Sequence, residues 1–143
     1  MKTLVFVSVV FCALILGSVT STSTAATGDQ KQKAVARFDR PVTLQGVVLK
    51  GTYLFVHDDA AMNRGEACSY IYKGELAVKD KLVVSFHCTH VERTKAAHFV
   101  LRTVDTPSGM PELREFQFSG ETASHAVPAP APTGVVTLAV YQE

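Results

Sequence analysis

Beyond residue 37 the chain consists of short segments in which apolar and polar residues alternate, separated by turns rich in Gly, Pro and Asp. In the clearest case, every second residue from Leu82 to His90 falls on one face of an extended chain, which places Cys88 among apolar neighbours. No stretch of this region keeps a helical period over three turns. Because each strand has one apolar face to bury, we predict an all-β fold, a small antiparallel β-sandwich or barrel of about seven strands. The predicted strands cover residues 38–49, 52–57, 68–72, 82–91, 97–104, 113–118 and 134–142.

The N-terminal residues have a different composition. Lys2 is followed by the apolar run Leu4–Leu16, and then by small and hydroxyl-bearing residues up to Ala25 and Ala26. This order is typical of a cleavable signal peptide, and we place the cut after Ala25 or one residue later. The apolar run is shorter than the ~20 residues of a membrane span, so we expect no stable membrane insertion after cleavage; a retained anchor is the alternative. The leader therefore predicts a periplasmic or secreted protein.

The same patterns divide the chain into segments. The polar, aperiodic stretch after the leader predicts a flexible N-terminal segment, and the alternation of Pro and Ala near the C-terminus predicts an extended spacer. The expected division is a signal peptide at 1–25, a flexible segment at 26–36, a β-sandwich domain at 37–127, a Pro/Ala spacer at 128–133 and a C-terminal strand at 134–143.

The charge balance argues against nucleic acid as a partner. The chain has 14 Lys and Arg and 13 Asp and Glu, and one of the basic residues, Lys2, lies in the leader. The remaining chain is formally neutral, so it has no overall field to attract a phosphate backbone. An envelope protein or a polysaccharide is a possible partner, and neither is assigned. Sugar sites favour exposed aromatic rings, but core packing explains the tyrosines equally well; these are Tyr53, Tyr70, Tyr72 and Tyr141.

Several short motifs carry a family resemblance. They are Phe38-Asp39-Arg40-Pro41-Val42, then residues 46–53 (GVVLKGTY), Asn63-Arg64, and a later series at Gly109, Pro111, Leu113, Phe116, Phe118 and Gly120. The chain resembles an uncharacterised group of small exported β-domain proteins of Gram-negative soil bacteria, whose pattern is F-x-x-P-V…L-P-A-G-T-Y…G-x-P-x-x-L-x-x-W-F-Y-P-G. The resemblance implies an exported β-domain and brings no activity, substrate or catalytic residue. Lys50 replaces the Pro-Ala of the pattern, and the Cys/His residues near position 88 are unusual for this group.

Two cysteines remain after removal of the leader, Cys68 and Cys88. An even number of cysteines in an oxidising compartment predicts one disulfide between them. Such a bridge would close a loop of about 20 residues and stabilise the fold by about 3 kcal/mol in the chain-entropy model. Two buried free thiols are the alternative.

Reactive side chains concentrate around Cys88 and His90, with His98 nearby. Imidazole and thiolate are the ligands that zinc and copper prefer. Two residues that are two apart on a strand project from the same face, so Cys88 and His90 could chelate one ion together with Cys68 or His98. His57 and His125 lie elsewhere in the sequence and are not assigned to this set.

No catalytic residue is predicted. The chain has no G-x-S-x-G motif, and His87 and Cys88 are adjacent strand residues that face opposite ways. We therefore predict a non-enzymatic exported β-domain of unknown role that needs no cofactor. The alternative function is a periplasmic Cys/His protein that binds copper or zinc.

Overall fold

A computed structural model describes residues 31–130 of the chain. The described part is all-β, as predicted, with eight strands, one short helix and one turn of 3₁₀-helix. The strands are β1 (Lys31–Leu44), β2 (Val47–Asp58), β3 (Ser69–Lys73), β4 (Leu82–Phe86), β5 (Thr89–Glu92), β6 (Val100–Val104), β7 (Glu112–Gln117) and β8 (Ala123–Ala126); the helices are α1 (Asp59–Asn63) and η1 (Lys79–Lys81).

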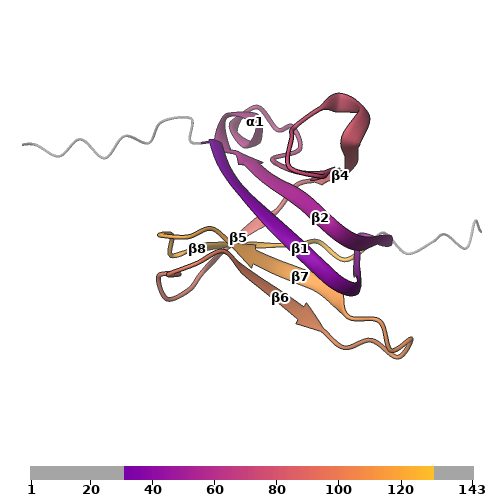
Figure 1. The fold of residues 1–143 in the computed structure, drawn as a ribbon. Helices are drawn as coiled ribbons and strands as arrows, with labels where there is room; N and C mark the ends of the chain where they lie inside the picture. Colours follow the sequence, from indigo (N-terminus) through magenta and orange to yellow (C-terminus); the bar gives the residue numbers. More distant parts are fainter. Residues whose placement is uncertain (1–30, 131–143) are drawn as a thin grey trace, which may run out of the picture.

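The strands form one curled sheet (Figure 1). Their order is β4-β3-β2-β1-β7-β8-β5. Strand β6 lies outside this order and pairs with β7. The β1–β2 hairpin crosses over the strands β5–β8 in Figure 1, so the sheet folds back on itself as a half-barrel. The bend lies where β1 meets β7, through a single parallel register position, Thr43 opposite Glu112. Strands that are distant in the sheet order therefore face each other across the interior.

The long β1–β2 hairpin turns at Gln45 and Gly46. Both residues have positive φ angles, 51° and 79°, which a two-residue hairpin turn of the primed type requires and which Gly adopts without strain. The register shifts between Phe38 and Val42, the stretch that holds Pro41, whose missing N–H cannot serve the ladder. This turn divides residues 38–49, which the sequence pattern predicted as one strand, between β1 and β2.

The core lies between the two halves of the sheet. Its largest fully buried side chains include Phe55 of β2 and Phe116 of β7, whose ring centroids are 5.5 Å apart. Leu44, Leu49 and Leu113 are also completely buried. Burying each such side chain contributes roughly 1.5–3 kcal/mol, so this cluster provides the main force that holds the curl closed.

A polar network covers the opposite face of β7. Glu115 is buried and accepts two hydrogen bonds from Arg93 (2.9 and 2.6 Å) and one from Arg102 (3.0 Å). Arg102 also donates to Gln117. Glu115 and Phe116 are neighbours on one strand, so the carboxylate and the core phenyl ring point to opposite faces.

Some predicted boundaries were wrong. Residues 31–36, predicted to be flexible, are strand: β1 starts at Lys31, which pairs with Asp58 of β2. The single strand predicted at 82–91 is broken at His87 and Cys88 into β4 and β5. The strand predicted at 97–104 is confined to β6, and β8 was not predicted. The predicted signal peptide at 1–25, the C-terminal strand at 134–143 and the spacer beyond residue 130 lie outside the described residues.

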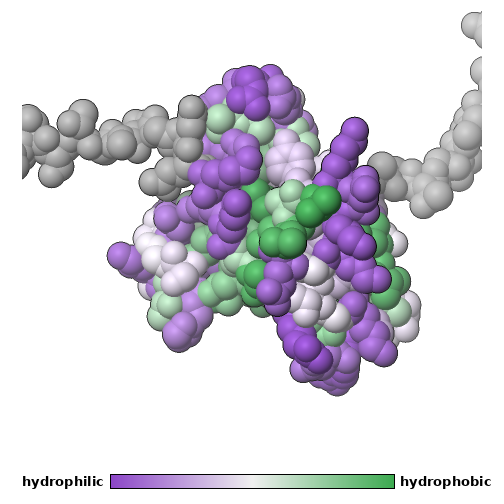
Figure 2. Space-filling model, turned by 45° about the horizontal axis from the view of Figure 1, so that its top comes forward, coloured by the Kyte–Doolittle hydropathy of each residue, from purple (hydrophilic) through white to green (hydrophobic). Residues whose placement is uncertain are grey.

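The face of the molecule drawn in Figure 2 is mainly hydrophilic. Figure 2 shows polar side chains over most of the visible face, around a smaller apolar area. Large apolar side chains that are exposed include Val35, Val48, Leu76, Val78, Leu82 and Val104. Among the described residues, no helix has the length and hydrophobicity needed to cross a membrane.

Candidate metal centre

Four metal-ligating side chains meet inside the curl of the sheet: His57, Cys88, His90 and His125, called the quartet below. Each offers one donor atom, and these four atoms all lie within 4.8 Å of one another. His57 is near the end of β2, His90 is on β5, His125 is on β8, and Cys88 immediately precedes β5. Since β2 and β8 are not paired strands, the quartet joins the two halves of the sheet across the interior.

Strand periodicity explains why these side chains point inward. His57 continues the row of Tyr53 and Phe55 on β2, both of which belong to the core. On the other half, His125 lies directly opposite His90 on one neighbouring strand and opposite Phe116 on the other. Residues directly opposite on adjacent strands share a face, so this row carries the two imidazoles to the core face of β7.

The imidazole rings are in close contact. The ring centroids of His57 and His125 are 4.1 Å apart, and those of His90 lie 5.6 Å from His57 and 5.0 Å from His125. The sulfur of Cys88 is 3.4 Å from Nδ1 of His125. In a tetrahedral zinc site with Zn–N near 2.0 Å and Zn–S near 2.3 Å, the nitrogen and sulfur are about 3.5 Å apart. This pair therefore already has the spacing of two ligands on one ion.

The two innermost histidines have unpaired polar atoms. His57 is fully buried and His125 is 2 % exposed. Within residues 31–130, Nε2 of His57 and Nε2 of His125 have no hydrogen-bond partner, and Nδ1 of His57 faces only the Asp59 carboxylate at 3.4 Å. Leaving a buried polar atom unsatisfied costs about 1–3 kcal/mol, so most such atoms in native proteins have a partner. A metal ion at the centre of the quartet would accept one lone pair from each ring, because a neutral imidazole has one nitrogen that can ligate and one that carries a proton.

The protonation states suit metal binding. Burial lowers the pKa of His57, with Asp59 opposing and His90 adding to the effect. Burial, together with His57 and His90, lowers the pKa of His125 to about 3. Both rings are therefore neutral at pH 7, which is the form that ligates metals. Burial, and to a smaller extent contact with Cys68, raises the pKa of Cys88 to about 12. A bound cation would therefore have to displace the thiol proton.

Neighbouring side chains hold the rings in place. A carboxylate oxygen of Asp59, the first residue of α1, is 3.4 Å from Nδ1 of His57. Metal-ligating histidines commonly face a carboxylate in this way. Phe116 stacks on His125 with centroids 5.1 Å apart and an interplanar angle of 23°, and Phe118 contacts the same ring edge-on. His90 is exposed and provides a route from solvent to the quartet.

The predicted disulfide is not formed in this structure. Cys68 and Cys88 are both free, and their sulfurs are 3.2 Å apart, well beyond the ~2.05 Å of a covalent bond. Cys68 is fully buried, and its sulfur accepts a hydrogen bond from the backbone N–H of Cys88 at 3.3 Å. The two thiols are therefore in contact; of the two buried free thiols that were the alternative to a bridge, only Cys68 is buried, since Cys88 is partly exposed.

Two of the four residues in the predicted metal-binding set belong to the quartet, namely Cys88 and His90. Cys68 touches the Cys88 sulfur but lies outside the quartet, and His98 is exposed before β6 and does not join it. Sequence reasoning missed His57 and His125. The alternation Tyr53, Phe55, His57 was a usable signal for the first, but nothing local pointed to the second because β8 was not recognised as a strand.

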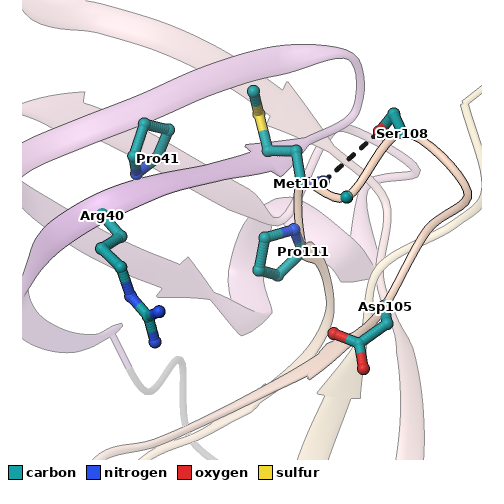
Figure 3. Close-up of a pocket in the computed structure, with 7 residues that line it drawn as sticks. Arg40, Pro41, Asp105, Ser108, Met110 and Pro111 are labelled. Atoms are coloured by element: carbon teal, nitrogen blue, oxygen red, sulfur yellow. Dashed lines mark hydrogen bonds between the residues drawn. The ribbon is translucent and has the colours of Figure 1, made fainter.

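A separate surface pocket of about 470 Å³ lies beside β1, under the loop between β6 and β7 (Figure 3). Its lining includes a positive and a negative side chain, Arg40 and Asp105, and the sulfur-containing side chain of Met110. It contains no imidazole or thiol. The pocket therefore lacks a donor set comparable with the quartet.

Comparison with protein-family models, with curated protein sequences and with solved structures found no match to this chain. The resemblance to small exported β-domain proteins stays a prediction. The function must therefore be argued from the quartet and its surroundings.

Proposed function

We propose that this protein is an exported, non-enzymatic β-domain that binds one transition metal ion, zinc or copper, through His57, Cys88, His90 and His125. The observation that carries the proposal is the convergence of four donor atoms within 4.8 Å from β2, β5, β8 and the segment before β5. The buried Nε2 of His57, which has no hydrogen-bond partner among the described residues, gives independent support.

The chemistry of the donors selects the class of metal. Three imidazoles and one thiol contain no oxygen ligand, which argues against calcium and magnesium. Nitrogen and sulfur ligands suit zinc and copper, and four protein ligands complete the tetrahedral coordination of zinc. A complete protein ligand set leaves no position for substrate. We therefore favour a role in holding a metal over a role in catalysis.

Bound metal would also be a cross-link. It would tie His57 on β2 to His90 and His125 on the strands beyond the bend of the sheet. Because a preformed donor set is absent from an unfolded chain, binding favours the folded state. The leader predicts that metal binding takes place after export, in the periplasm or outside the cell.

The test is metal binding by the native protein in its reduced form. Zinc and copper(I) are titrated separately under argon after chelator treatment, and bound metal is counted by native mass spectrometry. We expect one ion per chain. The proposal is wrong if the folded, reduced protein binds neither ion in stoichiometric amount.

His90→Ala and His98→Ala form a matched pair for the same titration. Both histidines are exposed; His90 contacts the rings of His57 and His125, whereas His98 lies outside the quartet. Loss of a ligand at His90 should weaken zinc binding roughly 100-fold, whereas His98→Ala should bind as the wild type does. Equal effects of the two changes would rule out the quartet as the site.

A further inference from the structure

The contact between Cys68 and Cys88 links the quartet to thiol oxidation. Cys88 supplies the only sulfur of the quartet, and the Cys68 sulfur lies 3.2 Å from it. We infer that these cysteines form a thiol–disulfide switch for metal occupancy: the dithiol form binds the metal and the disulfide form releases it. This inference rests on the proposed metal-binding function.

The geometry favours reaction between these two sulfurs. The sulfurs need to approach by only about 1 Å to reach the ~2.05 Å of a disulfide bond. The backbone already holds the two residues together, because Cys68 N–H donates to the Phe86 carbonyl and Cys88 N–H donates to the Cys68 sulfur. The bridge would join the start of β3 to the segment between β4 and β5.

The two states exclude each other because they use the same atom. As a metal ligand, the Cys88 sulfur is a thiolate; in a bridge, it is bonded to the Cys68 sulfur and has lost its negative charge. The disulfide form retains three imidazoles and no anionic donor. It should therefore bind zinc much more weakly than the dithiol form.

The exposure of the two cysteines sets the order of the steps. Cys88 is partly exposed and Cys68 is fully buried, so a small disulfide such as oxidised glutathione can reach only Cys88. The Cys88 thiol first loses its proton to the buffer; its sulfur then attacks one sulfur of the oxidant, whose S–S bond breaks and releases one glutathione, which takes up a proton as the thiol. The Cys68 sulfur then attacks Cys88 and expels the second glutathione as a thiol. In total, two protein thiols lose two electrons and two protons, and one oxidised glutathione becomes two reduced molecules.

The experiment compares zinc binding by the two forms of the full chain. Oxidised glutathione is added to the metal-free protein, the loss of two hydrogens is verified by mass, and zinc is titrated before and after oxidation. We expect affinity to fall at least roughly 100-fold on oxidation and to return fully with a phosphine reductant. Far-ultraviolet circular dichroism of both forms shows whether the fold is retained.

Cys68→Ser is the matched control, because it leaves the quartet intact and cannot form the bridge. Without oxidant, this variant should bind zinc as the wild type does; with oxidised glutathione it should stop at the mixed disulfide on Cys88, seen as the added mass of one glutathione, because no second thiol can resolve it. If the bridged wild type binds zinc within threefold of the dithiol form, the switch is wrong, although the metal site stands. If the dithiol form binds no zinc, the proposed function itself fails.

Discussion

His57 of β2 and His125 of β8 stack across the interior of the sheet with ring centroids 4.1 Å apart, although their strands are not paired with each other. Both rings are buried, and within residues 31–130 neither Nε2 atom has a hydrogen-bond partner, while Nδ1 of His57 faces Asp59 and Nδ1 of His125 faces the Cys88 sulfur, each at 3.4 Å. Such a pair weakens the fold by itself, since its polar atoms have lost water without gaining a partner. A metal ion bound by the two rings would offset this cost.

Replacing His125 by Phe should separate stability from function. The new ring would fit between Phe116 and Phe118, which already contact His125, and it would remove a buried nitrogen with no partner. We expect the free energy of unfolding of the metal-free protein to rise by about 1–2 kcal/mol, while zinc binding is lost. Urea unfolding and zinc titration of the same sample measure the two effects. A variant that is less stable and still binds zinc would contradict both parts.

The metal-free protein should become less stable in mild acid. His125 has a pKa of about 3 in the folded protein against 6.5 ordinarily, and the pKa of His57 is also lowered. The groups facing His125 are His57, His90 and the Cys88 thiol. Between pH 6.5 and 3 the unfolded chain binds more protons, so stability is complete above pH 6.5 and falls as the pH decreases. At pH 5 the loss from His125 is about 2 kcal/mol.

Urea unfolding of the chelator-treated, reduced protein at pH 7.5, 6 and 5 measures this slope. His125→Phe removes one titrating group and should give a shallower slope over the same range. An unfolding free energy that stays constant from pH 7.5 to 5 would show that the histidines are not held neutral by burial.

Zinc should raise the thermal stability of the reduced protein. At a free concentration of about 100 times Kd, a ligand that binds only the folded state adds about 2.7 kcal/mol. For a domain of about 100 residues this corresponds to a rise in Tm of roughly 10 °C or more. Differential scanning fluorimetry with zinc and with magnesium measures this rise in Tm. Magnesium should have no effect, and an equal rise with both ions would mean nonspecific stabilisation.

Glu115 should be important for stability and irrelevant to metal binding. Its carboxylate is buried between Arg93 and Arg102, and the Arg93 hydrogen bonds lower its pKa to about 2. Glu115→Gln would leave these cations poorly paired and should lower the free energy of unfolding by about 2–3 kcal/mol. The exposed pair of Arg64 and Glu66 offers the control, because Glu66→Gln should cause no measurable loss.

The carboxyl group of Glu115 should also make the free energy of unfolding depend on pH in the acid range. A carboxyl group with a lowered pKa stabilises the fold above its ordinary pKa of 4.5, and the contribution disappears as the pH falls toward 2. The difference between wild type and Glu115→Gln should therefore be constant above pH 5 and shrink below pH 4.5. A difference that persists at pH 2.5 would indicate a packing defect instead of a lost charge interaction.

Export can be tested through the leader. The protein recovered from the periplasm or the medium should have the mass of a chain that begins at Ala26. A charge in the apolar run, Val9→Asp, should keep the full-length precursor inside the cell, whereas Ser8→Ala should be processed normally. A full-length chain recovered outside the cytoplasm would contradict cleavage.

The sequence alone determined the all-β class, because alternation of apolar and polar residues is a local property of each strand. It also placed Cys88 and His90 near each other, since they are two residues apart in the chain. Only the tertiary structure revealed the quartet. His57 and His125 meet because the sheet bends where β1 joins β7, which brings β2 over β8. Contacts across a curled sheet depend on how all its strands pack together, and no local pattern encodes them.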